Sequence, residues 1–226
     1  MSEILSKERR LHTMVLFHAL IAALGLISVP LHIFFSPEPS VSITKFTIHS
    51  NIIVTITFIV SFLLAGNKES RLLDLSKNAA LIYMMVVLMT YHFILSGGGE
   101  YNGTRNITNF TLHYLIPMFV LLNWIIFEKK KWYSYKTIAF WLAFPILYGA
   151  ISLVRGMYDG FYPYFFLNPN GHIPVGVGSY ANVALVIAGL TFVYCMLGFL
   201  LILINRIILR YKNGKFPLRQ NIDKQT

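Results

Sequence analysis

Long apolar stretches alternate with short polar segments along the whole chain of 226 residues. Each stretch approaches the roughly 20 mostly apolar residues that a helix needs to cross a bilayer. The six stretches are residues 11–35, 43–65, 79–96, 109–127, 137–155 and 181–208. The first is too long for the apolar region of a signal peptide, and no small-residue cleavage site follows it. The pattern therefore predicts an all-α polytopic membrane protein, a single domain over residues 1–226 with six transmembrane helices.

The composition excludes the other broad classes of protein. Hydrophobic residues make up 56% and charged residues 12% of the chain, and the mean hydropathy is +0.61. Soluble domains carry about 25% charged residues. A soluble domain of this size cannot bury so much apolar surface, and disordered chains are far less hydrophobic. The single cysteine, Cys195, leaves no partner for a disulfide within the chain.

Basic residues gather on one side of the predicted membrane. Of the 19 Lys and Arg residues, sixteen lie in or beside the terminal segments and the connections after the second and fourth spans. The other three are Lys45, Arg105 and Arg155. Because cytoplasmic segments are enriched in Lys and Arg, this split predicts a multi-pass protein of the cell membrane with both termini in the cytoplasm. The net charge of +10 then reflects orientation and contact with membrane lipid. It does not indicate nucleic-acid binding, and no protein partner can be inferred.

Polar side chains form stripes in three of the predicted spans, toward the non-cytoplasmic side. In the second span, Thr44, Thr47, Asn51 and Thr55 recur every three or four residues, which is the spacing of one helix face. Two similar stripes are Asn109, His113 and Pro117 in the fourth span, and Trp141, Pro145, Tyr148, Ser152 and Arg155 in the fifth. Such groups either join helices through hydrogen bonds or line a shared cavity, and the spacing is compatible with both.

Thr47 and His113 stand out because they lie at similar depth. Each is about four residues into a span that enters from the non-cytoplasmic side, so both are about 6–8 Å below their helix starts. A hydroxyl is a weak nucleophile until a nearby base takes its proton, and imidazole is the usual base. The two residues are therefore a candidate catalytic pair. The structural alternatives are a Thr bonded to its own helix and a His that only packs.

The connection formed by residues 156–179, between the fifth and sixth spans, is long and rich in Gly, Pro and aromatic residues. It is expected to form either a lid over the cavity or an aromatic belt at the membrane interface. Arg155, just before it, can hold a lipid carboxylate, pair with Asp159 or extend to the surface. The seven histidines form neither Cys-x-x-Cys-His nor His-Glu-x-x-His, so no metal or cofactor is expected.

Four short motifs follow one another between about residues 43 and 170, more than half of the chain. The first is Phe46-Thr47-Ile48-His49-Ser50-Asn51, and the second is His113-Tyr114-Leu115-Ile116-Pro117 followed by Asn123-Trp124. The others are Pro145 with Tyr148, then Arg155-Gly156, followed by Tyr162-Pro163-Tyr164-Phe165-Phe166-Leu167-Asn168-Pro169. They resemble F-T-x-x-S-N, H-Y-x-x-P…D-W and P-x-x-Y…R-G…Y-P-Y-x-F-L-D-P in the bacterial six-helix "Pr-6-Pr" membrane family.

This family is similar to the androgen-induced integral-membrane hydrolases of animals, which cleave fatty acid esters of hydroxy fatty acids with an intramembrane Thr and a His. By position, the resemblance implies that Thr47 is the nucleophile and His113 the base. Asn123 and Asn168 stand where the family has Asp. A neutral amide cannot act as the carboxylate that polarises a histidine.

The sequence thus supports two hypotheses of function. The first is an intramembrane hydrolase of fatty-acyl esters, with Thr47 and His113 in a cavity open to the non-cytoplasmic side. Ser50 and Asn51, one turn deeper, are then expected to donate hydrogen bonds to the oxyanion, and Tyr148 and Arg155 to bind substrate. The alternative is a non-catalytic membrane protein that binds a lipid or small molecule in the same cavity.

Overall fold

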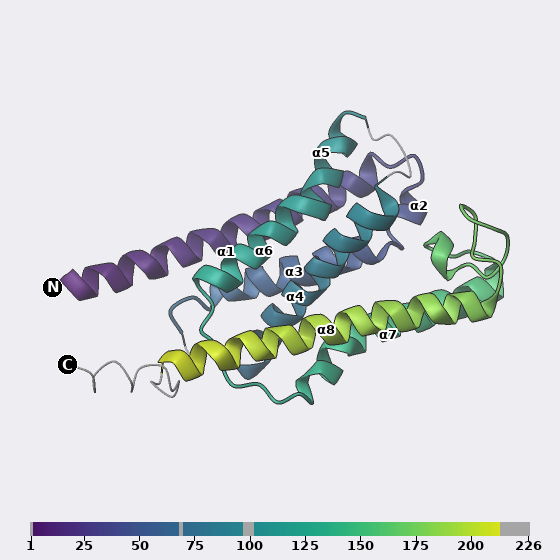
Figure 1. Cartoon of the computed structure of the whole chain (residues 1–226). Helices are drawn as coiled ribbons and strands as arrows, with labels where there is room; N and C mark the ends of the chain where they lie inside the picture. Colours follow the sequence, from purple (N-terminus) through teal and green to yellow (C-terminus); the bar gives the residue numbers. More distant parts are fainter. Residues whose placement is uncertain (1, 68–69, 97–101, 213–226) are drawn as a thin grey trace.

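The computed structural model describes residues 2–67, 70–96 and 102–212, in which all regular structure is helical (Figure 1). The longer helices are α1 (Ser2–Phe34), α3 (Phe46–Leu63), α4 (Arg71–Thr90), α6 (Ile116–Ile126), α7 (Thr137–Asp159) and α8 (Tyr180–Lys212). The shorter elements are α2 (Pro39–Ser42), α5 (Thr104–Phe110), the π-helical turns η1 (Tyr91–Leu95) and η2 (Thr111–Leu115), and the 3₁₀ turn η3 (Phe165–Leu167).

Six segments of the described chain are long and apolar enough to cross a membrane, which confirms the predicted number of spans. They are Leu5–Phe34, Phe46–Leu63, Arg71–Leu95, Thr104–Ile126, Thr137–Asp159 and Tyr180–Lys212. Because the number is even, the described chain starts and ends at the same end of the bundle, which Figure 1 shows. Lys45, Arg105 and Arg155 lie at the opposite end, where α3 and α5 begin and α7 ends. Of the sixteen other basic residues, Lys68, Lys215, Arg219 and Lys224 lie outside the described residues.

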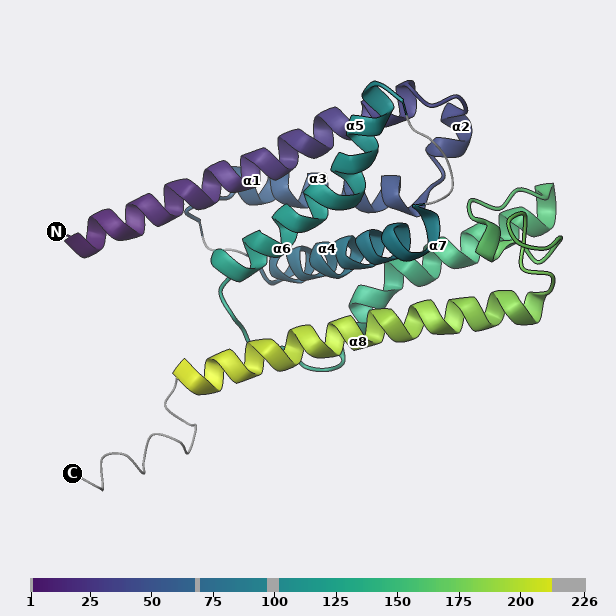
Figure 2. The ribbon, with the colours of Figure 1, turned by 45° about the horizontal axis from the view of Figure 1, so that its top comes forward.

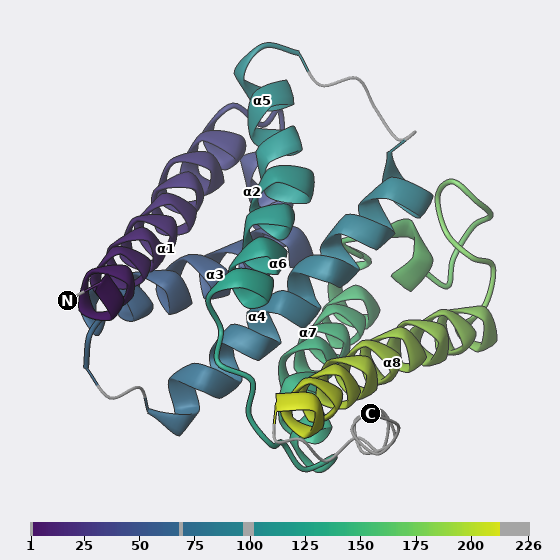
Figure 3. The same cartoon turned by 60° about the vertical axis from the view of Figure 1, so that its left-hand side comes forward.

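The helices pack as a four-span bundle with a helical pair beside it. α1 packs against α3, α5 and α6, while α4 contacts α3 and α6 on one side and α7 and α8 on the other. Figures 2 and 3 show α7 and α8 running together along one flank of the bundle. The fully buried side chains Phe58, Met84, Ile116, Trp141 and Ile202 come from both parts. One core therefore connects the pair to the bundle through α4.

The third span begins earlier than residue 79, the start predicted from hydropathy. α4 already starts at Arg71, and it buries Asp74 and Lys77. Lys77 Nζ lies 2.8 Å from Glu128 Oε1, and Lys131 pairs with Asp74. Charged groups tolerate such burial only when they are paired. The ion pairs explain why a helix can continue through positions that an apolar pattern excludes.

The helices α1 and α3 approach closely at Gly25. A Cβ atom built on Gly25 would lie 1.9 Å from Thr55 Oγ1, so only glycine fits against this threonine. The Thr55 hydroxyl donates to the carbonyl of Asn51 at 2.7 Å, within its own helix. Small residues let membrane helices approach in this way. At Thr55, therefore, the polar stripe of α3 faces another helix and not a cavity.

Candidate functional site

Two π-helical turns lie at the end of the bundle opposite the termini. η1 follows α4, and η2 joins α5 to α6. Such turns are rare in proteins, and many of those that are found lie at functional sites. η1 carries the buried Tyr91, and η2 carries the buried His113. His92 Nδ1 of η1 lies 3.2 Å from the Tyr114 hydroxyl of η2, so a hydrogen bond links the two turns.

Thr47 and His113 form a buried hydrogen-bonded pair. Thr47 Oγ1 lies 3.2 Å from His113 Nε2, and the two residues are 8% and 7% exposed. The other ring nitrogen, Nδ1, lies 2.9 Å from the carbonyl oxygen of Asn109. A carbonyl only accepts, so Nδ1 carries the proton and Nε2 accepts from the Thr47 hydroxyl. The two side chains therefore lie close together, as their similar depth predicts. His113 has the tautomer that a general base needs. The catalytic role of the pair stays a prediction.

Tyr91 holds the imidazole of His113 from one face. The two rings stack with their centroids 3.9 Å apart at an interplanar angle of 26°. The Tyr91 hydroxyl accepts a hydrogen bond of 2.5 Å from Asn109 Nδ2. Asn109 therefore fixes both rings, one through its carbonyl and the other through its side chain. This arrangement leaves the imidazole little freedom to turn away from Thr47.

Asn51 bridges the helix of Thr47 and the π turn of His113. Its Nδ2 donates to the carbonyl of Thr47 at 2.8 Å and to that of Leu112 at 3.3 Å. The Ile116 N–H donates to the Thr111 carbonyl, five residues back. In the same five-residue register, the Leu112 carbonyl would accept from the backbone nitrogen of residue 117, which is a proline. Proline has no N–H. Asn51 supplies the missing donor, and it thereby ties α3 to η2.

Replacing Asn51 with leucine should therefore misalign the pair without touching either member. Under the hydrolase hypothesis, the kcat of ester hydrolysis should fall by about 10- to 100-fold, because displacements near 1 Å are costly in catalysis. Ser50→Ala is the matched control, since Ser50 is equally buried and its hydroxyl has no hydrogen-bond partner among the described residues. Kinetics on both purified variants make the comparison. Equal losses in the two would contradict a positioning role for Asn51.

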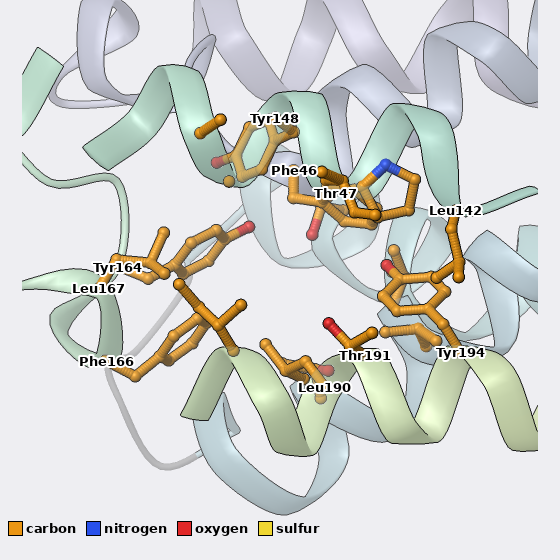
Figure 4. Close-up of a pocket in the computed structure, with 18 of the residues that line it drawn as sticks. Phe46, Thr47, Leu142, Tyr148, Tyr164, Phe166, Leu167, Leu190, Thr191 and Tyr194 are labelled. Carbon is orange, nitrogen blue, oxygen red and sulfur yellow. The ribbon is translucent and has the colours of Figure 1, made fainter. Parts of the chain in front are cut away.

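Two cavities meet at Thr47. The apolar cavity has a volume of about 290 Å³, and its walls include Phe46, Leu142, Tyr148, Phe166, Leu190 and Tyr194 (Figure 4). The polar cavity has a volume of about 390 Å³, and its walls include His32, Glu38, Lys45, Arg105 and His113. Thr47, Tyr91, Leu95 and Tyr164 line both cavities. The hydroxyl-bearing residue therefore lies between a hydrocarbon-like space and a charged one.

The first turn of α3 offers a hydrogen-bond donor beside this hydroxyl. Thr47 is the second residue of the helix, where backbone N–H groups have no partner inside the helix. Within the described part of the chain, no group accepts from the Thr47 N–H. The positive end of the helix dipole also favours negative charge here. An oxygen anion formed at Thr47 would meet this N–H.

The structure places three of the other predicted site residues differently from the sequence hypothesis. Ser50 lines neither cavity, and Asn51 already donates to two carbonyls, so an oxyanion role for Asn51 does not agree with its bonds. Arg155 also lines neither cavity. It bonds Asp159 at 2.9 Å and lies over the ring of Phe161. Of the alternatives open for Arg155, the pair with Asp159 is the one observed.

Tyr148 and the aromatic connection do reach the site. Tyr148 lines the apolar cavity, and its hydroxyl donates to the Thr44 carbonyl at 2.8 Å. Because α7 continues to Asp159, the connection covers residues 160–179. Its Tyr164, Phe166 and Leu167 form part of the cavity wall. The segment thus covers the apolar cavity, as the lid hypothesis requires.

The polar cavity contains functional candidates that the sequence hypothesis did not select. Lys45, Arg105 and His32 come from the start of α3, from α5 and from the end of α1. His32 Nδ1 lies 3.0 Å from Thr108 Oγ1, which joins α1 to α5. The signal was present in the charge count. Lys45 and Arg105 are two of only three cations on the sparsely charged side.

The two asparagines that replace the aspartates of the similar family lie away from the pair. Asn123 Nδ2 donates to Glu128, and Asn168 Nδ2 donates to the Val175 carbonyl. Neither residue lines a cavity that contains Thr47. In residues 2–67, 70–96 and 102–212, no group of three or more His, Cys, Asp or Glu residues is placed to hold a metal ion. The absence of a metal or cofactor from the chemistry stays a prediction.

Comparison with known proteins adds no relative to this picture. No family model matches the chain, and neither a curated protein nor a solved structure matches it. The function must therefore be argued from the site itself.

Proposed function

We propose that this protein is an intramembrane hydrolase of fatty-acyl esters, with Thr47 as nucleophile and His113 as general base. One observation carries the proposal: the His113 ring donates from Nδ1 to a carbonyl and holds Nε2 3.2 Å from the Thr47 hydroxyl. A nucleophile, its base and a third group that orients the base are the minimal arrangement for acyl transfer. The motif resemblance assigns the same roles to the same two residues.

The reaction follows from this arrangement in two halves. Thr47 Oγ1 attacks the ester carbonyl carbon while its proton passes to His113 Nε2, and the Thr47 N–H stabilises the negative oxygen. The tetrahedral intermediate collapses, the imidazolium protonates the departing alcohol, and an acyl-threonine ester remains. In the second half, His113 takes a proton from water, which attacks the acyl-threonine. Collapse returns the proton to Thr47 and releases the fatty acid.

The two cavities suit the two parts of such a substrate. The apolar cavity, between α3, α4, α7 and α8, suits an acyl chain. Its wall includes Ile146, which is 57% exposed on the outer surface of α7. In a bilayer that surface meets lipid, so a substrate can approach from within the membrane. The polar cavity suits the alcohol part, which leaves first.

The alternative is a membrane protein that binds a lipid in these cavities without chemistry. Both hypotheses use the apolar cavity. What favours catalysis is the hydrogen bond from Nδ1 to Asn109, because a binding pocket does not need a particular histidine tautomer.

Probe labelling separates the two hypotheses. We expect purified protein in lipid nanodiscs to react with a fluorophosphonate, and mass spectrometry to find the adduct on the peptide that contains Thr47. We also expect release of free fatty acid from a panel of palmitoyl esters. If the protein is not labelled and releases no fatty acid, but retains lipid through purification, the result would favour the lipid-binding hypothesis.

The proposal includes an orientation, with both termini in the cytoplasm of the cell and the site near the non-cytoplasmic face. The positive-inside rule and the charge distribution support it. Reporter fusions truncated at Asn67 and Lys136 should therefore show cytoplasmic activity, and a fusion at Gly171 should show the opposite. A non-cytoplasmic signal at Asn67 would reverse the orientation.

A further inference from the structure

The wall of the polar cavity carries more positive than negative charge. Lys45 and Arg105 line it together with His32, and Glu38 is the only carboxylate among the described residues of the wall. Within the described residues, no ion pair joins Glu38 to Lys45. A partly buried cation is costly unless something compensates its charge. Lys45 therefore lines the cavity without an ion-pair partner among the described residues, which points to an anion that occupies the cavity during function.

Lys45 is held in place and still has donors to offer. Its ammonium group donates to the carbonyl of Pro163, and it lies 4.8 Å from the centroid of the Tyr164 ring. An ammonium has three N–H donors, so this contact leaves two of them. Burial lowers the pKa of Lys45, the Arg105 charge lowers it further, and Glu38 opposes the shift. The two cations therefore act on each other, and an anion bound between them would favour both charged forms.

The position of this charge relative to the nucleophile limits the substrate. Lys45 is the residue immediately before α3, two positions from Thr47, and both residues line the polar cavity. The volume of about 390 Å³ corresponds to roughly a dozen groups the size of a water molecule, at about 30 Å³ each. An anionic group that is joined to the ester oxygen by a short linker fits within this space.

We propose that Lys45 and Arg105 form a subsite for an anionic group on the alcohol part of the substrate. The preferred substrates are then fatty-acyl esters of short anionic alcohols, whose charge is a phosphate or a carboxylate. That the bound molecule is a substrate, and not only a ligand, rests on the proposed function. The anion subsite itself does not depend on turnover.

Matched esters test the subsite. One pair is 1-palmitoylglycerol 3-phosphate and 1-palmitoylglycerol, and the other is O-palmitoyl glycolate and its methyl ester. We expect kcat/KM to favour the anionic member of at least one pair by about 10- to 100-fold, the range of a charge-assisted hydrogen bond. The pair with the larger ratio shows whether the natural charge is phosphate or carboxylate. Ratios near one in both pairs would overturn the proposal.

Substitutions locate the effect. Lys45→Gln and Arg105→Gln should each reduce the anionic-to-neutral ratio by about tenfold or more. Lys129→Gln, an exposed lysine at the opposite end of the bundle, is the matched control and should leave the ratio unchanged. If Arg155→Gln reduced the ratio and Lys45→Gln did not, the subsite would lie where the sequence hypothesis placed it, and the present assignment would be wrong.

A binding measurement separates this inference from the proposed function. Thr47→Ala protein in nanodiscs is titrated calorimetrically with hexadecyloxyacetate and with the uncharged 2-hexadecyloxyethanol, two ethers that contain no ester bond to hydrolyse. We expect tighter binding of the anion, and loss of that preference when Lys45→Gln is added. This result, without turnover of any ester, would retain the subsite and reject the hydrolase. Equal binding of both ethers would reject the subsite whatever the turnover.

Discussion

Thr47→Ala should abolish ester turnover and probe labelling while leaving the protein folded. Without the attacking oxygen no acyl intermediate forms, so kcat should fall by roughly 10³-fold or more. The substitution removes one buried hydroxyl that donates to His113. Its loss should cost only about 0.5–1.5 kcal/mol of stability. Fatty-acid release and thermal unfolding, measured on the same preparation, separate lost chemistry from lost fold.

Two companion variants make this result specific. Thr47→Ser keeps the attacking oxygen and should retain part of the activity. His113→Ala should depress labelling and turnover together, because the hydroxyl then keeps its proton at neutral pH. Labelling that survives in Thr47→Ala would remove Thr47 from the nucleophile role. Ser50 would be a poor substitute, since it lines neither cavity.

Glu128→Gln should produce the largest loss of stability among the charged residues. Its carboxylate lies 2.8 Å from Lys77 Nζ, and the two side chains are 13% and 3% exposed. Removing one partner of a buried pair takes the compensating charge away from the other, which typically costs about 3–5 kcal/mol. The measurement is thermal or denaturant unfolding in detergent.

The double variant Lys77→Met with Glu128→Met tests the cause of this loss. It leaves no unpaired charge, so it should recover much of the stability lost in Glu128→Gln. The exposed pair of Arg155 and Asp159 is the matched control, because Arg155→Gln breaks an ion pair in contact with solvent. Comparable losses in Arg155→Gln and Glu128→Gln would show that burial is not what makes the inner pair important.

Apolar length was enough to predict the six spans, because the bilayer imposes one minimum length on every helix. It was not enough to place the start of α4. Asp74 and Lys77 look like residues of a connection until their partners Lys131 and Glu128 are known. Those partners lie in or beside the connection to α7, so no local pattern identifies them. The π turns were also beyond the pattern, because each changes the register by one residue inside an apolar stretch.

Depth along a helix was predictable for the site, but rotation about the helix was not. Thr47 and His113 were found because both lie about four residues into their spans. Asn51 and Ser50 lie one turn deeper, and only the packing of α3 against η2 decides that Asn51 faces backbone carbonyls. The direction of the Arg155 side chain is set by its ion pair with the neighbouring Asp159. Lys45 and Arg105 converge on one cavity from helices that are far apart in sequence.

The π turn η2 makes the site depend on chain length to the single residue. A π turn contains one residue more than the α-helical turn that it replaces, and each residue of a helix rotates the chain by about 100°. Deleting one residue between Asn109 and Pro117 would restore a regular helix and turn α5 by that angle relative to α6. Thr108 could then no longer meet His32 while His113 meets Thr47. A homologue with a one-residue gap here would keep every polar residue of the motif and still lack the geometry of the pair.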